Sequence, residues 1–157
     1  MQFLEKDVNI FDLPSNYVLC RVVSEKNLGD KDYEDVFTKK FPKMKGRIIA
    51  YMERQKHCIQ WDGGIAFYVA HVDNSGDKIV ISLVLDDKSN YKVEKDFRGA
   101  LWSGFMNLRL FMEQNKLTDV AFSNKNFNID PYQEVVKDVF KNTNINITKC
   151  NEKEEQC

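Results

Sequence analysis

Glycine, proline and histidine are scarce in this sequence, which holds seven, three and two of them among 157 residues. We find no internal repeat, no low-complexity tract and no linker rich in proline or glycine, so nothing divides the chain. Neither His57 nor His71 stands at a metal-ligand spacing, and no G-x-S-x-G or phosphate-loop pattern occurs. These absences predict one domain without a resident metal or cofactor.

Paired cysteines are also missing, because the four thiols at positions 20, 58, 150 and 157 form no C-x-x-C motif. This spacing argues against a zinc ribbon or a thioredoxin-type site and is typical of free thiols in a reducing cytoplasm. Cys20 and Cys58 have apolar neighbours, which predicts small core residues rather than reactive groups.

The chain has no excess of charge of either sign and no long apolar run. Lys and Arg total 23 against 24 Asp and Glu, so the basic field that non-specific nucleic-acid binding requires is absent. No apolar stretch approaches the roughly 18 residues of a membrane span, and residues 1–7 lack the pattern of a signal peptide. We therefore expect a cytoplasmic protein with neither a nucleic-acid nor a membrane partner, and the sequence does not indicate its oligomeric state.

What the sequence does contain is an alternation of strand and helix patterns. Residues 17–23 are almost continuously apolar, which predicts a central strand covered on both faces. The other elements follow from periodicity and turn chemistry: helices over 32–41 and 43–57, hairpin strands 65–72 and 79–85, the longest helix over 93–116, a strand over 118–122, a helix over 130–141 and a strand over 145–148. The order predicts a three-layer α/β/α domain with a mixed β-sheet over residues 1–149, followed by a disordered charged tail, 150–157.

Two loops are candidates for a ligand site, because ligands of open α/β sheets gather at the carboxyl ends of the strands. One is 24–32, after the central strand, and the other is 123–130, whose Asn and Ser residues can expose backbone amides to an anion. Ordinary polar connections remain the alternative for both. Asp86 and Asp87, after the strand 79–85, fit a solvated strand end better than a carboxylate pair facing the same crevice.

Several segments resemble the macro domain family, and within it the branch of terminal ADP-ribose protein glycohydrolase. The resemblance covers nearly the whole chain and consists mostly of positions that determine the fold. It rests on Ile10-Phe11-Asp12-Leu13-Pro14, Val23-Ser24-Glu25, Val36 to Phe41, Phe97-Arg98-Gly99-Ala100-Leu101, Asn115 to Val120 and Val139 to Thr148. The resemblance implies a macro-like fold whose ligand is ADP-ribose or a related nucleotide.

The ligand loops depart from the pattern of that branch. Asn9 stands where the resemblance implies an acidic residue that reads adenine, whereas Ser24 and Glu25 are retained. The first Gly-rich turn has become Gly29-Asp30-Lys31-Asp32, and the second, Ser123-Asn124-Lys125-Asn126-Phe127, has no glycine, although glycine lets the backbone approach phosphate closely. The carboxylates of Asp30 and Asp32 are expected to repel a diphosphate.

The catalytic positions are not reproduced in register either. The lysine of the branch falls on or beside Asp86, and its aspartate falls on Asn128. No catalytic residue is identified, and Lys88 and Asp130, each two positions further on, are the only candidates. The resemblance therefore favours a degenerate, non-catalytic site.

The function that follows is a non-catalytic binder of an ADP-ribose-like or other nucleotide-type ligand. The residues expected to bound its crevice are Asn9, Ser24, Asp30, Asp32, Asn124, Asn126, Phe127 and Asn128. Phe127 either stacks on the ligand or plugs the core beneath its loop. Two alternatives remain open: a residual ADP-ribosyl hydrolase that uses Lys88 or Lys125 with Asp130, and a domain with a closed pocket that acts through protein contacts.

Overall fold

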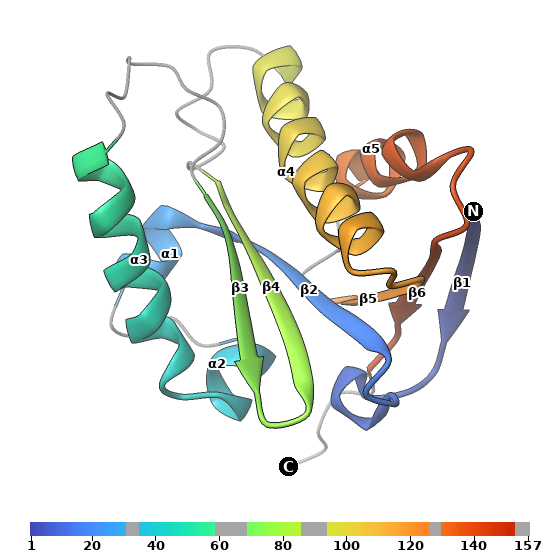
Figure 1. Ribbon diagram of the computed structural model, residues 1–157, viewed down its shortest axis with the longest axis horizontal. Helices are drawn as coiled ribbons and strands as arrows, with labels where there is room; N and C mark the ends of the chain where they lie inside the picture. The colour runs from blue at the N-terminus through green and yellow to red at the C-terminus, as the bar shows by residue number, and fades with distance from the viewer. Residues whose placement is uncertain (31–34, 59–68, 86–93, 126–129, 153–157) are drawn as a thin grey trace.

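A computed structural model describes residues 1–30, 35–58, 69–85, 94–125 and 130–152, which contain one six-stranded sheet (Figure 1). The strand order is β1-β6-β5-β2-β4-β3. All neighbours run parallel except β3 and β4, so the sheet is mixed, as predicted. The strands are β1 Gln2–Lys6, β2 Tyr17–Ser24, β3 Val69–Ser75, β4 Lys78–Leu85, β5 Asp119–Ser123 and β6 Asn146–Cys150.

Strand β2 lies inside the sheet, between β5 and β4, which confirms the prediction for residues 17–23. Its residues from Val18 to Val23 are all buried. Val18 and Val22 face one hydrophobic cluster and Leu19 and Val23 face the other, because successive side chains of a strand point to opposite faces. Burial on both faces therefore explains why nearly every position of β2 is apolar.

Helices cover both faces of the sheet, so the three-layer α/β/α architecture is confirmed (Figure 1). The helix α4, the longest described, packs with α5 on one face through Phe105, Leu108 and Phe140. Leu28, Phe37 and Met44 pack on the other face. The helices are the 3-10 helix η1 Ile10–Asp12 and the α-helices α1 Glu25–Gly29, α2 Val36–Lys40, α3 Met44–Cys58, α4 Glu94–Gln114 and α5 Asp130–Phe140.

Some boundaries differ from those predicted. The hairpin turn is only Gly76-Asp77, since β3 continues to Ser75, and Gly76 takes the positive φ of 65° that glycine tolerates best. The final strand, expected over 145–148, extends to Cys150, which is buried; the division into a domain over 1–149 and a tail over 150–157 stays a prediction. Residues 59–68, which include part of the first hairpin strand, and the tail residues 153–157 lie outside the described residues.

Two charged side chains of the described strands are buried, Arg21 and Asp73, and Arg21 lies at the centre of the sheet. Arg21, in β2, is fully buried; its Nε donates to Ser82 Oγ at 3.0 Å and its Nη1 lies 3.1 Å from both carboxylate oxygens of Asp35. Asp35 also caps α2, because its Oδ1 accepts the backbone N–H of Thr38 at 2.8 Å. Arg21 Nη2 has no hydrogen-bond partner among the described residues. The ion pair therefore ties the centre of the sheet to the start of α2.

Candidate ligand pocket

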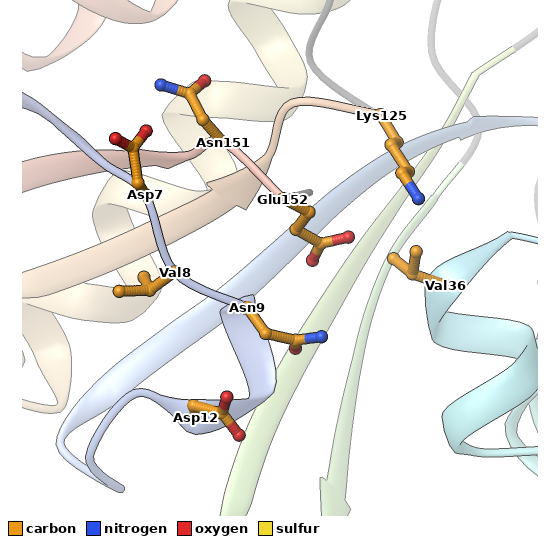
Figure 2. Close-up of a pocket in the computed structure, with 8 residues that line it drawn as sticks. All are labelled: Asp7, Val8, Asn9, Asp12, Val36, Lys125, Asn151 and Glu152. Atoms are coloured by element: carbon orange, nitrogen blue, oxygen red, sulfur yellow. The ribbon is translucent and has the colours of Figure 1, made fainter. Parts of the chain in front are cut away.

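A cavity of about 460 Å³ opens where three parallel strands end (Figure 2). Its walls come from the segment after β1, from η1 and α2, and from the residues that follow β5 and β6. The lining residues are Asp7, Val8, Asn9, Asp12, Val36, Lys125, Asn151 and Glu152. This is the edge of the sheet at which open α/β proteins bind ligands.

The strand register brings these segments together. Cys150 pairs with Lys6 of β1 and with Ser123 of β5, so all three strands end on the same line. The ladder continues one residue further, since Asn151 N donates to Lys6 O at 2.8 Å and Asn124 N donates to Cys150 O at 2.9 Å. Residues far apart in the sequence therefore leave the sheet side by side.

The turn η1 forms one wall of the pocket, and Asn9 begins it. Asn9 Oδ1 accepts the backbone N–H of Phe11 at 2.9 Å, which is the N-cap role that asparagine favours. Phe11 packs edge-on against Phe37 and Phe41 of the α2 region, with ring centroids 5.3 and 5.6 Å away. Aromatic contacts thus fix η1, and with it Asn9, against α2.

Glu152 reaches into the pocket from the end of β6. Its Oε1 accepts the backbone N–H of Ile10 at 3.3 Å, and its own backbone N–H donates to Asn124 Oδ1 at 3.2 Å. In Figure 2 its carboxylate lies between Asn9 and Lys125. With Asp7 and Asp12 it gives the described part of the lining three carboxylates against the one ammonium of Lys125, so this part of the pocket is acidic.

Comparison with known proteins identifies the fold. The sequence matches no protein-family model and no curated protein. Solved structures do match: the macrodomain of DarG from Thermus aquaticus is 12% identical, with a TM-score of 0.64 over 96% of this chain and 98% of that chain. A mutant of the Oceanobacillus iheyensis macrodomain is 9% identical, with a TM-score of 0.61 over 98% and 84%. The IBV X-domain is 10% identical, with a TM-score of 0.58 over 99% and 91%.

This chain has the macrodomain fold. The similarity is structural, with sequence identities of 12% and below, so it establishes the fold alone. Activity depends on the site residues that the fold carries.

The macrodomain fold brings some of the sequence-predicted site residues together. Asn9 lines the pocket, with Lys125 on another of its walls, and Asn124 holds the backbone of Glu152 beside them. Asn9 and Asn124 are thus linked through Glu152, whose carboxylate contacts the residue after Asn9. Of the three segments in which the resemblance implies ligand contacts, the one after β1 and the one after β5 border this cavity, and the described part of the turn after β2 does not.

Other predicted site residues do not line this pocket. Ser24 caps α1 by accepting the backbone N–H of Asn27 at 3.0 Å. Residues 25–29 form α1 itself, so the first candidate loop is largely a helical turn and not an open loop. Asp30 follows it, and its carbonyl accepts from Lys45 Nζ at 2.6 Å. Asp130 is exposed at the first turn of α5.

The remaining predicted positions, Asp32, Lys88, Asn126, Phe127 and Asn128, lie outside the described residues. Their roles stay predictions, as do those of Asp86 and Asp87, which also lie there.

The pocket includes residues that sequence patterns did not indicate. Glu152 and Asn151 belong to a charged C-terminal segment, which resembles a solvated tail in composition. Asp12 and Val36 were part of the segments that carry the resemblance but had no expected role. Glu152 lies at the pocket because it follows β6, which pairs with both β1 and β5. This pairing cannot be read from one sequence, so no sequence pattern indicated Glu152.

The described thiols are not activated for chemistry. Cys20 is buried in the core, as predicted, and burial raises the pKa of its thiol. Burial, with the nearby Glu152 carboxylate, raises the pKa of Cys150 to about 11. Both thiols are therefore protonated at neutral pH, whereas the thiolate is the nucleophile. The side chain of Cys58 lies outside the described residues.

Metal-binding clusters and membrane-spanning helices are both absent from the part of the chain that the structure describes. No three His, Cys, Asp or Glu side chains there gather in a group that could hold a metal ion. None of the described helices combines the length and the apolar character that crossing a bilayer demands.

Proposed function

We propose that this chain is a non-catalytic binding domain for ADP-ribose or a related nucleotide, with the ligand in the pocket at the ends of β1, β5 and β6. The observation that carries the proposal is the cavity of about 460 Å³ at this edge of a macrodomain fold. Its volume lies in the range of small-molecule sites, about 300–1,000 Å³. Donors and acceptors from separate segments, including Asn9 and Lys125, converge on it.

The same cavity argues against the alternative of a closed pocket that serves only protein contacts. A collapsed site would leave no space between η1, α2 and the end of β6. Here those three elements frame the cavity and place polar side chains around it. A small ligand is the simplest occupant of such a space.

A non-catalytic role is supported by the chemistry of the lining. Asp130, the acidic candidate for catalysis, is not among the described residues that line the cavity, and Lys125 is the only lysine among them. Lys125 is exposed, and it is the one cationic side chain among the described residues that line the cavity. The described lining therefore holds neither the buried lysine nor the pair of neighbouring cations that is typical of a lysine nucleophile.

ADP-ribose is expected to bind weakly, with a dissociation constant above roughly 10 µM, because carboxylates that line the pocket repel the diphosphate. Calorimetry at low and at high salt tests the cause. Screening weakens charge repulsion, so affinity should rise as salt is raised to about 0.5 M. A thermal-shift series with adenosine, AMP and ADP-ribose provides a second reading, since a ligand that binds only the folded state raises Tm.

Lys125→Ala is the test variant in that experiment, and Lys116→Ala is its control. Loss of the single ammonium should weaken ADP-ribose binding further, whereas Lys116→Ala, just beyond the end of α4, should not change it. Submicromolar binding by the wild type would contradict the weak-binding prediction. Failure of every adenine ligand to bind would contradict the proposed function itself.

The hydrolase alternative has its own test. We expect no release of ADP-ribose from glutamate-linked or serine-linked protein conjugates above a heat-killed control, because neither catalytic position carries the residue that the chemistry needs. Turnover well above that control would overturn the non-catalytic proposal. The variants Lys88→Ala, Lys125→Ala and Asp130→Ala would then show which side chains carry the reaction.

A further inference from the structure

Strand β3 borders the sheet and has peptide groups that no described element uses. It pairs with β4 alone. Residues of an antiparallel pair alternate between those that bond the partner strand and those whose N–H and C=O groups point away from it. A two-residue turn is closed by a hydrogen-bonded pair, here Ser75 and Lys78, so the alternation directs the peptide groups of Val72 and Asn74 outward. Neither residue has a backbone partner outside the β3–β4 ladder among the described residues.

The common protections of an edge strand are missing from β3. Proline, lysine and bulges are devices that prevent a further strand from pairing at such an edge. The strand Val69–Ser75 contains neither proline nor lysine, and its pairing with β4 is continuous along its whole length. Val72 is 40% exposed, which leaves an apolar side chain beside the edge. The strand is therefore suited to accept another extended segment.

Helix α3 lies beside β3 and contacts it at two levels (Figure 1). Arg47 Nε and Nη2 donate to the two carboxylate oxygens of Asp73 at 2.7 and 3.0 Å. One turn further along α3, the ring of Tyr51 meets the ring of His71 edge-on, with centroids 5.1 Å apart. Four helical residues rise about 6 Å and two strand residues about 6.6 Å, so each turn of α3 stays level with one residue on the α3 side of β3.

The side of α3 next to β3 carries three cations, Lys43, Arg47 and Arg54, which we call the cationic row. Their spacings of four and seven residues place them on one side of a helix. Lys43 belongs to the same helical turn as Arg47, whose backbone N–H donates to Lys43 O at 3.4 Å. Arg54 lies over the ring of Tyr51, 6.0 Å from its centroid, and so at the level of His71. The cationic row therefore follows the length of β3.

Two cations of the row have no counter-charge. Arg47 is paired with Asp73, but no carboxylate forms a salt bridge with Lys43 or Arg54 among the described residues. The surrounding sequence has the same sign, since residues 39–56 hold seven Lys and Arg and a single acidic residue, whereas the whole chain has 23 basic and 24 acidic residues. The balanced net charge thus conceals a basic side that attracts anionic partners.

We propose that β3 and the cationic row form a docking surface for an extended acidic segment of a partner protein, which pairs with β3 as an added strand. Peptide groups of the sheet edge supply affinity in this mode of binding, and alternate side chains supply specificity. On the α3 side the segment places carboxylates beside Lys43 and Arg54, with an uncharged residue opposite Asp73, which already has Arg47. On the other side it places apolar residues, one of them against Val72. This surface is independent of the nucleotide pocket.

Two other occupants fit this surface less well. If two copies of the chain paired antiparallel through β3, opposite residues would share a face of the joined sheet. The two α3 helices would then lie on the same face, and their cations would repel each other. A nucleic acid has phosphates for the cationic row but no peptide groups to pair with the strand edge. An acidic peptide segment satisfies both features.

The test uses a peptide with the core Glu-Val-Thr-Val-Glu, which has the same order of side chains in either direction along β3. Its Glu residues fall at the two ends of the cationic row, its Thr falls opposite Asp73, and its Val residues lie on the other side. Calorimetry and the shifts of the Val72 and Asn74 amide resonances measure binding. A peptide of the same composition in the order Glu-Glu-Thr-Val-Val should bind at least about tenfold more weakly, because it lacks the alternation.

Backbone pairing is tested separately with two N-methylated peptides. One carries methyl groups on both Val amides, which face β3 if the peptide runs antiparallel, and the other on the Thr and second Glu amides, which face β3 if it runs parallel. An N-methyl group removes a donor from the ladder only where the amide faces β3. One peptide should therefore lose about tenfold or more in affinity, while the other keeps it. Equal binding by both would overturn the inference.

The double variant Lys43→Gln, Arg54→Gln tests the contribution of charge. It should weaken peptide binding about fivefold or more at low salt, whereas Lys141→Gln, beyond the end of α5, should not change it. Circular dichroism checks that each variant folds. An unchanged affinity of the double variant would overturn the inference. So would a dimer of the free protein that the peptide dissociates, or a single-stranded RNA that displaces the peptide and binds more tightly.

Discussion

Asp35→Ala is expected to lower the free energy of unfolding by about 3–5 kcal/mol, because it leaves the buried guanidinium of Arg21 without its counter-ion. Arg21 is fully buried and the side chain of Asp35 is only 8% exposed, so water cannot replace the lost carboxylate. Part of the loss, about 1 kcal/mol, comes from removal of the helix cap at Thr38 N. Urea denaturation, with the midpoint and the slope both fitted, measures the total.

Two further variants separate the charge from the cap. Asp35→Asn keeps a capping oxygen for Thr38 N but removes the negative charge, so most of the loss should persist. Glu134→Ala breaks an exposed pair with Arg98, in which the side chains of Arg98 and Glu134 are 40% and 55% exposed, and should cost less than about 1 kcal/mol. A loss below about 1 kcal/mol for Asp35→Ala would show that Arg21 finds another partner or that water enters.

The double variant Arg21→Met, Asp35→Leu tests how much the ion pair contributes to the net free energy of unfolding. Burying two charges costs desolvation free energy that their attraction often fails to offset. We therefore expect the double variant to be about as stable as the wild type, although Asp35→Ala alone is not. That combination would show that the Arg21–Asp35 pair contributes little net free energy of unfolding, although loss of one partner is costly.

The parts of the fold that the sequence predicted share one property, which is burial dictated by apolar periodicity. The run Val18 to Val23 is buried on both faces, and the stripe through Phe97, Leu101, Phe105 and Leu108 fixes the buried side of α4. Such patterns exist because burial of apolar surface drives folding, so they are visible without knowledge of the partners.

The parts that were not predicted lack that pattern. Strand β1 carries exposed residues at four of its five positions, with only Phe3 packed against the core, so it shows no alternation. Arg21 interrupts an apolar strand, and its partner Asp35 lies on another element. Both depend on pairings made by the finished fold and not on the local sequence.

The candidate site also contains one residue that was expected and one that was not. The expectation for Asn9 came from the resemblance, and the structure does place Asn9 at the pocket. Glu152 was assigned to a disordered tail because charged terminal residues usually form one. Its place at the pocket follows from the register in which Cys150 pairs with Lys6 and Ser123, and such pairing leaves no local signature in the sequence.

Phe37→Ala is the second substitution with a large expected effect, a loss of about 3–5 kcal/mol in the free energy of unfolding. Phe37 is fully buried, lies under the guanidinium of Arg21 at 5.7 Å and meets the ring of Phe11 edge-on at 5.3 Å. Truncation leaves a cavity among these groups and removes the contact that positions η1. Phe105→Ala, in the core beneath α4, is the matched control for stability and should cost a similar amount.

The milder pair Phe37→Leu and Phe105→Leu tests whether this contact also shapes the pocket. Each leaves a folded protein with a somewhat smaller side chain, so both should lower stability by less than the alanine variants. Only Phe37→Leu removes the edge-on contact with the ring of Phe11. Phe11 belongs to η1, whose Ile10 and Phe11 amides donate to Glu152 and Asn9. The Ile10 and Phe11 amide resonances should therefore shift in Phe37→Leu and stay in place in Phe105→Leu. Equal shifts in both variants, or none in either, would show that η1 is fixed by the strand ends and not by its aromatic contact with α2.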